Sequence, residues 1–384
     1  MLENAPRKVN HASAYVGHYI YSFGGYCSNS NESFDTHSPI EVHRLNTRTL
    51  EWTDLTSVYN WKESTADVPF NRYGHTVIAD GHKIYLWGGR DDNCACNTLF
   101  EFDAYTHTWS RPKVCGDIPR ARDGHSATIY NKKVYIFGGF ESESESFSQQ
   151  VHVIDLNNFK WSYIHTTGEP PNWCDFPTIT YLNNSLYVFG GRSDAQGQHH
   201  TNSEMYDDKI RRLDLDSLRW EVIKLSPNSS PGPIGRRSHS AFVHDGCLYI
   251  FGGYNANIQR HFNDLHRFDP IKKEWSSIST AGDGPCPRRR QCCVLIGHKL
   301  YLFGGTSPSK SQNDDITIYS VPLALEDHGD LYVLDFAPSL KTLARLECIK
   351  YDLDTSQLPD TIREDIEIAT GKIKTSLRPS ISSC

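Results

Sequence analysis

The sequence predicts an all-β protein built from six repeated four-stranded units and followed by a short helical region. Six segments end in a double glycine: YIYSFGG, KIYLWGG, KVYIFGG, SLYVFGG, CLYIFGG and KLYLFGG. Thirteen residues before each first glycine stand His11, His75, His125, Pro177, His239 and Gln291. After residue 337 the spacing of apolar residues changes from alternating to helical. A constant offset through six copies indicates a repeat architecture.

Each repeat unit predicts four short strands. The first is a short segment such as HSATIY, and the second is the apolar run before the double glycine. That run is too short for a helix and rich in aromatic residues, so we expect burial on both of its faces. The two glycines allow positive φ and close backbone approach. The third strand ends near an acid, as in LFEFD, and the fourth carries a tryptophan in five copies: Trp52, Trp109, Trp161, Trp220 and Trp275.

Units of about 50 residues with this order of features resemble kelch repeats, which form the blades of a β-propeller. The resemblance covers roughly residues 7–337 and implies a six-bladed kelch β-propeller over that range. The fourth copy has Cys174 and Pro177 where other copies have Arg and His. The sixth copy has no tryptophan strand, and residues 1–6 are too few to supply an obvious one. The sequence therefore leaves open how the ring closes.

Composition excludes several classes of protein. The chain of 384 residues is 38% hydrophobic and has a net charge of −7, which supports a large core and argues against broad binding of nucleic acid or membrane. It contains no apolar run of signal-peptide or membrane-spanning length. The eleven cysteines are scattered, which favours a reducing compartment over a disulfide framework. We expect a cytoplasmic protein without a cofactor, and nuclear entry stays open.

Basic residues gather in two kinds of loop. In a four-stranded meander, the loop between strands two and three lies on the same face as the crossover to the next blade. Before the first strands stand Lys8, Arg72, Arg122, Arg236 and Arg288; further arginines in these loops are Arg90, Arg192, Arg237 and Arg289. In an acidic protein such a group indicates a small anionic ligand, for example a carboxylate or a phosphate. The arginines that recur with the repeat also have a structural interpretation, because a residue present in most repeats usually stabilises the repeat.

Catalytic patterns are hard to find in the sequence. The histidines at the repeat position are more typical of structural hydrogen bonders than of metal ligands. Some kelch-type propellers are iron-dependent, with Glu, Asp and His at four-residue steps, but here Glu326 and Asp330 are followed by Leu334. A Ser-His-Asp set and a glycine-rich phosphate loop are both absent. We therefore expect a protein that is not an enzyme.

Residues 338–370 predict two helices. Ser339 is placed as the N-cap of the first, which presents Leu340, Leu343 and Leu346. Pro359 starts the second. These helices either cover the open edge of blade six or insert apolar side chains into a groove of another protein. We expect residues 371–384 to be a disordered tail.

The two helices resemble the docking boxes of cullin-ligase receptors. The first resembles the elongin-C-binding box at Ser339, Leu340, Leu343, Ala344 and Cys348, with Ala344 where the box has Cys and Cys348 where it has an aliphatic residue. The second resembles the cullin-2 box, whose pattern is satisfied by Leu358, Pro359, Ile362 and Ile366. Six kelch repeats followed by this pair of boxes are the organisation of the kelch-domain-containing receptors of cullin-2 ubiquitin ligases. The resemblance implies elongin B/C, cullin-2 and its RING subunit as partners.

Within that family, one group binds substrate proteins through C-terminal tails that end in glycine. In a related member the arginine directly after a double glycine holds the terminal carboxylate, and Arg192 matches it by position; Arg237 stands where that member has a serine. The resemblance and the arginine loops together give these candidate peptide-binding residues: Arg192, Arg236, Arg237, Ser238, Arg289, Arg90 and Tyr254. Asp123 and Asp175 are candidates for a wall that receives a basic residue before the glycine.

Two other functions stay open at this point. A scaffold or a chromatin- or cytoskeleton-associated propeller would use the tail only to close the ring. A small-molecule or metal-dependent propeller enzyme would be recognised by its metal content.

Overall fold

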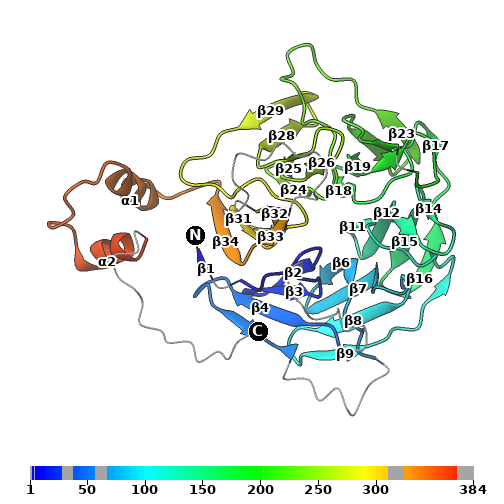
Figure 1. Cartoon of the computed structure of the whole chain (residues 1–384), viewed down its shortest axis with the longest axis horizontal. Helices are drawn as coiled ribbons and strands as arrows, with labels where there is room; N and C mark the ends of the chain where they lie inside the picture. The colour runs from blue at the N-terminus through cyan, green and yellow to red at the C-terminus, as the bar shows by residue number, and fades with distance from the viewer. Residues whose placement is uncertain are drawn as a thin grey trace. The chain divides into compact units, whose positions relative to one another are not determined.

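The computed structural model describes residues 2–3, 5–27, 38–56, 67–201, 203–309 and 324–369. It divides into two compact units, Met1–Leu334 and Asp335–Cys384. In the first unit, six sheets of four or five strands surround a common centre, with strand one of each sheet innermost (Figure 1). The predicted all-β, six-bladed propeller is therefore confirmed.

Blades one to three share the predicted meander, in which neighbouring strands are antiparallel. Blade one contains β2 (Ala12–Val16), β3 (Tyr19–Phe23), β4 (Val42–Asn46) and β5 (Trp52–Asp54). Blade two contains β6 (Tyr73–Asp80), β7 (Lys83–Arg90), β8 (Leu99–Asp103) and β9 (Thr108–Ser110). Blade three contains β11 (Ser126–Tyr130), β12 (Lys133–Phe137), β15 (Val151–Asp155) and β16 (Lys160–Tyr163), and β10 (Cys115–Gly116) lies parallel to β16.

Blades four to six follow the same plan. Blade four contains β18 (Thr178–Leu182), β19 (Ser185–Phe189), β22 (Arg211–Asp214) and β23 (Arg219–Val222), with β17 (Thr167–Gly168) parallel to β23. Blade five contains β24 (Ser240–His244), β25 (Cys247–Phe251), β28 (Leu265–Asp269) and β29 (Glu274–Ile278). Blade six contains β30 (Cys292–Ile296), β31 (Lys299–Phe303), β34 (Asp330–Asp335) and β1 (Leu2–Glu3).

Short hairpins follow the double glycine in blades three to six. They are β13 (Phe140–Glu141) with β14 (Ser146–Phe147), β20 (Ser193–Asp194) with β21 (Glu204–Met205), β26 (Tyr254–Asn255) with β27 (Arg260–His261), and β32 (Thr306–Pro308) with β33 (Leu325–Asp327). They belong to the loops in which the sequence places Arg192 and Tyr254.

The N-terminal strand closes the ring. Leu2 pairs with Leu331 and Glu3 pairs with Asp330, so β1 is the outer strand of blade six. The N–H of Ala5 then donates to the carbonyl of Gly329 at 3.0 Å. The expectation that residues 1–6 are too few to supply a strand is wrong, because two residues are enough when the neighbouring backbone groups already lie in register.

The tryptophans of strand four join neighbouring blades. In each of five interfaces, the indole packs against the aromatic residue just before the double glycine of the preceding blade. The pairs, with distances between ring centroids, are Trp52–Phe303 (5.1 Å), Trp109–Phe23 (5.8 Å), Trp161–Trp87 (5.4 Å), Trp220–Phe137 (5.8 Å) and Trp275–Phe189 (5.8 Å). Such pairs stabilise an interface beyond the burial of their apolar area.

The arginines that recur with the repeat link each blade to the one before it. The Arg122 guanidinium donates to the carbonyl of Gly138 in its own blade, and the Arg122 carbonyl accepts from Gly89 of the preceding blade. Arg72, Arg236 and Arg288 make the same two bonds. A Cβ atom at Gly190, where φ is +65°, would lie 2.3 Å from the carbonyl of Arg236, so this close approach requires glycine. The structural interpretation of these four arginines is confirmed.

The second unit contains α1 (Leu340–Lys350) and α2 (Asp360–Ala369). The Ser339 side chain accepts a hydrogen bond from the N–H of Thr342 at 3.1 Å, so it is the N-cap of α1 as predicted. No helix among the described residues is long and apolar enough to cross a membrane. The disordered tail expected at residues 371–384 lies outside the described residues.

Candidate functional site

One face of the propeller collects the residues that the sequence singled out. Each crossover residue next to strand one forms a β-bridge with the residue that follows a double glycine. The bridges include Asp175 with Arg192, Arg237 with Tyr254, and Arg289 with Thr306. The two kinds of loop therefore do meet on one face, as the meander geometry predicts.

A closed ring of backbone hydrogen bonds forms the centre of this face. Its members are the residues just before the repeat position: Asn10, Gly74, Gly124, Phe176, Ser238 and Arg290. Each N–H donates to the carbonyl of the equivalent residue in the preceding blade, with N···O distances from 2.6 to 3.3 Å. All six have positive φ, which includes the bulky residues Phe176 (49°) and Arg290 (61°). The bonds hold these side chains in fixed positions around the axis.

Arg192 and Arg237 share a single carboxylate. Arg192 binds Asp175 through two nitrogens, with Nε 3.0 Å from Oδ1. Its third nitrogen lies 3.5 Å from Glu204 Oε1, and Arg237 lies 3.7 Å from the same oxygen. Burial alone would raise the pKa of Glu204, but the Tyr206 hydrogen bond and the charges of Arg237 and Arg192 lower it. Glu204 is therefore an anion between two cations.

Arg289 is a poorly compensated cation of this face. Its guanidinium stacks on the Tyr254 ring, 4.4 Å from the centroid, and its buried Nε has no hydrogen-bond partner. Among the described residues, Arg289 lies within ion-pair distance of no carboxylate. Burial, together with the charges of Arg290 and Arg237, lowers the pKa of Arg289 to about 10. An anion bound here would relieve this repulsion.

Arg290 is a fourth arginine of the face, which the sequence analysis missed. It donates to the Tyr26 hydroxyl, and its guanidinium lies 5.6 Å from the centroid of the Phe176 ring. The sequence did carry a signal for it. The equivalent residue in two other blades is a glycine, Gly74 or Gly124, and the residue at this position has positive φ in every blade. We call Arg192, Arg237, Arg289 and Arg290 the arginine cluster.

The remaining predicted residues have different roles. Arg236 is fully buried and forms two bonds with Asp264, so it belongs to the inter-blade links and does not reach the face. Arg90 donates to the carbonyl of Asp91 at 3.0 Å, and Ser238 is a buried member of the backbone ring. Asp175 is only 1% exposed and orients Arg192, so it is no open wall for a basic residue.

Comparison with known proteins identifies the family. The family model for the KLHDC2/KLHL20/DRC7 Kelch-repeats domain matches residues 10–146 and 74–305. The chain belongs to the kelch-repeat family. Its sequence is 47% identical to kelch domain-containing protein 3 of Homo sapiens and of Bos taurus, over 100% of this chain and 98% of each relative. It is also 31% identical to acyl-CoA-binding domain-containing protein 5 of Arabidopsis thaliana, over 73% of this chain and 44% of that protein.

The kelch propeller is typically a non-catalytic scaffold for protein interactions, and no enzymatic family is indicated. Two of the repeat histidines act as structural hydrogen bonders, as expected. His125 and His239 each share a 2.8 Å hydrogen bond with a threonine of the preceding blade, Thr76 and Thr178. Burial lowers the pKa of both histidines to about 3, so they stay neutral.

A buried acid lies beside the arginine cluster of this kelch ring. Asp123 is 6% exposed, and its Oδ1 has no hydrogen-bond partner. Burial and the nearby Asp175 raise the pKa of Asp123 to about 7, although Arg90, Arg192 and Arg290 oppose the shift. Burial also raises the pKa of Asp175, and the charge and hydrogen bond of Arg192 oppose this rise only in part. The charge of the face therefore depends on pH near neutrality.

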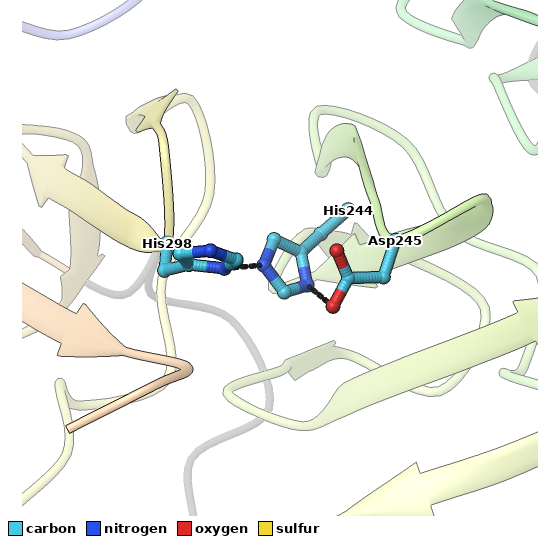
Figure 2. Close-up of side chains that lie close together, drawn as sticks. All are labelled: His244, Asp245 and His298. Atoms are coloured by element: carbon cyan, nitrogen blue, oxygen red, sulfur yellow. Dashed lines mark hydrogen bonds and ion pairs between the residues drawn. The ribbon is translucent and has the colours of Figure 1, made fainter.

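His244, Asp245 and His298 form a cluster of a different kind in the kelch ring, which Figure 2 shows. The His244 ring lies between the other two side chains: Nε2 is 2.9 Å from His298 Nδ1, and Nδ1 is 3.6 Å from the Asp245 carboxylate. The two ring nitrogens of His244 therefore face different neighbours, Nε2 toward His298 and Nδ1 toward Asp245. As arranged, one hydrogen bond between His244 and His298 joins the turns of blades five and six, and Asp245 lies beside His244.

Proposed function

We propose that this kelch protein is a non-enzymatic substrate receptor of a cullin-2 ubiquitin ligase. The arginine cluster binds substrate C-termini that end in glycine. The tail helices α1 and α2 recruit elongin B/C, cullin-2 and its RING subunit, which transfer the ubiquitin. The two parts of this proposal rest on separate observations and are tested separately.

The arginine cluster supports recognition of a terminal carboxylate. Arg192 and Arg237 flank one anion, Glu204, and Arg289 keeps a buried donor nitrogen without a hydrogen-bond partner. A carboxylate is a planar, two-oxygen acceptor that matches the donor geometry of arginine. The aromatic rings of Tyr254 and Phe176 hold two of these arginines in place. Such preorganisation favours a small anion because little side-chain freedom is lost on binding.

The tail supports the assembly part of the proposal. Leu340 is 85% exposed on α1, and Leu343 and Leu346 are also exposed. Exposed apolar residues on one helix suit insertion into a hydrophobic groove. The similarity to kelch domain-containing protein 3 also extends through the tail, because it covers the whole chain. By contrast, the similarity to the plant acyl-CoA-binding protein covers only 73% of the chain.

The observation that carries the proposal is the charge of Arg289, which no described carboxylate compensates. The experiment removes this charge and measures peptide binding. The probe is a labelled ten-residue peptide that ends in Arg-Gly with a free carboxylate, and binding is measured by fluorescence anisotropy. We expect Arg289→Gln to weaken binding by roughly 10- to 100-fold, since a charge-assisted hydrogen bond contributes about 1.5–3 kcal/mol.

Two controls make this experiment specific. The same peptide with a C-terminal amide lacks the carboxylate and should lose a similar amount of affinity for the wild-type protein. Arg219→Gln removes an exposed arginine of β23, which is outside the loops that contain the arginine cluster. This change should leave the affinity unchanged. Equal binding of the acid and the amide peptides would refute carboxylate recognition.

A further inference from the structure

One interface of the propeller lacks its tryptophan. In five interfaces an indole from strand four contacts the aromatic residue before the double glycine. Blade six has no such tryptophan, because its outer strand is β1. Between blades five and six lies a cavity of about 320 Å³ instead, and Phe251 forms part of its wall. A cavity of roughly 150 Å³ already accommodates benzene, so this one has room for an indole.

The walls of the cavity repeat the surroundings of Trp275 in the neighbouring interface. There, Trp275 packs with Phe189, Ile223, Ile250 and Phe268. The residues at the equivalent repeat positions in the next interface are Phe251, Ile278, Leu302 and Leu334. All four line the cavity. The cavity therefore has the same kind of apolar wall residues as the site that Trp275 fills, but no tryptophan of this blade fills it.

A strand edge accompanies the cavity. In blade five, Trp275 pairs across the sheet with Phe268, which corresponds to Leu334 in blade six. Strand β1 pairs with β34 at Leu331 and Asp330, and from Leu2 the chain runs toward Asp330, away from Leu334. On the β1 side of β34, the pairs stop at Leu331 and no described strand pairs with Leu334, while β31 occupies the other side. The edge of β34 beside the cavity can thus accept an added strand.

We infer that this cavity binds an extended peptide segment of a partner protein that carries a tryptophan or a similar large aromatic side chain. The segment pairs antiparallel with β34 beside Leu334, as β29 pairs with β28, and its ring enters the cavity. The five occupied interfaces define the chemistry of the occupant: an extended backbone and an indole-sized apolar group. This site does not involve the arginine cluster or the tail helices, so it is independent of the proposed function.

The test uses a peptide that copies a strand four of the protein itself. A labelled peptide with the sequence of residues 272–279, KKEWSSIS, is titrated with the full-length protein, and anisotropy is recorded. We expect saturable binding that weakens at least tenfold when the tryptophan of the peptide is replaced by alanine. Equal binding of the two peptides, or the absence of binding, would overturn the inference, and neither result depends on a protein variant.

Two further arms locate the site and identify the source of the aromatic group. Leu334→Arg places a charge in the cavity wall and should abolish peptide binding, whereas Ile271→Arg, at a side chain that is 85% exposed, should not. Peptide binding that survives Leu334→Arg in a folded protein would overturn the assignment of the site. Free indole should bind at least tenfold more weakly than the peptide, because it lacks the strand. Equal affinity would point to a small aromatic ligand and contradict the peptide.

Discussion

Consecutive arginines of this protein have opposite roles. Arg236 is fully buried, binds Asp264 and links two blades, while Arg237 lies in the arginine cluster near Glu204. Arg288 and Arg289 form a second such pair. The side chain of each recurring arginine, such as Arg288, donates to the carbonyl of the first glycine of its own blade. The next residue, such as Arg289, forms a β-bridge with the residue that follows the double glycine. One step along the chain therefore separates a structural cation from a candidate binding cation.

The sequence predicted part of this division. Four arginines depart from the repeat: Arg192, Arg237 and Arg289 lie in the arginine cluster, whereas Arg90 donates to the carbonyl of Asp91. Arg236 follows the repeat, and it is structural. Glu204 could not be found in this way, because it lies in the β20–β21 hairpin, whose loop length does not follow the repeat. An acid that approaches the cluster from such a hairpin has no constant offset to reveal it.

Asp123 predicts a pH dependence of ligand binding. Its pKa is about 7, so the carboxyl becomes neutral as the pH falls below that value. The terminal carboxylate of a peptide stays ionised, since its usual pKa is about 3.5. We expect the affinity for a glycine-ended peptide to rise roughly two- to fivefold between pH 8 and pH 6, because one nearby negative charge is lost. Asp123→Asn should flatten this change, and an undiminished change in that variant would assign it to other groups.

At the scale of elements, β1 shows what a pattern search cannot detect. A strand of two residues has no periodicity, and its partner β34 lies more than 300 residues away in the sequence. Its formation depends on backbone groups of blade six that are already placed by β31. The second strand of each blade is an apolar run beside a double glycine, and it was predictable because its burial pattern is local.

Ring closure predicts a loss of stability when β1 is removed. Deleting residues 1–5 removes the pairs with Leu331 and Asp330 and the bond from Ala5 to Gly329. At about 1 kcal/mol for each backbone hydrogen bond, the melting temperature should fall by several degrees. The comparison is Glu3→Ala, which keeps the backbone and should melt within about one degree of the wild type. Unchanged melting of the deletion variant would mean that β1 contributes little to closure.

A single substitution in helix α1 tests whether this helix docks to elongin B/C. Leu340→Glu replaces an exposed apolar side chain next to the N-cap, so the fold should persist while capture of elongin B/C is lost. Lys341→Glu changes the charge of the adjacent exposed residue and should retain capture. The measurement is co-purification with elongin B/C for both variants. Equal capture by Leu340→Glu and the wild type would exclude Leu340 from the docking surface.

At the scale of the whole molecule, the chain joins a propeller with a candidate ligand face to a separate helical unit. A scaffold propeller needs only the first of these. A ligase receptor needs both, because the substrate and the ligase bind at the same time. The sequence predicted the six blades from a repeated offset and the two helices from a change in spacing. It showed that the sixth copy lacks a tryptophan, but only the structure shows that a cavity remains between blades five and six.

The most direct test of the receptor hypothesis is co-purification with elongin B/C, in which the full-length protein is compared with a variant that ends at Phe336. Both proteins should be folded by their melting curves, because the propeller unit ends at Leu334. We predict that the full-length protein captures elongin B/C and the shortened one does not. A folded full-length protein that captures no elongin B/C would contradict the account and favour a scaffold propeller.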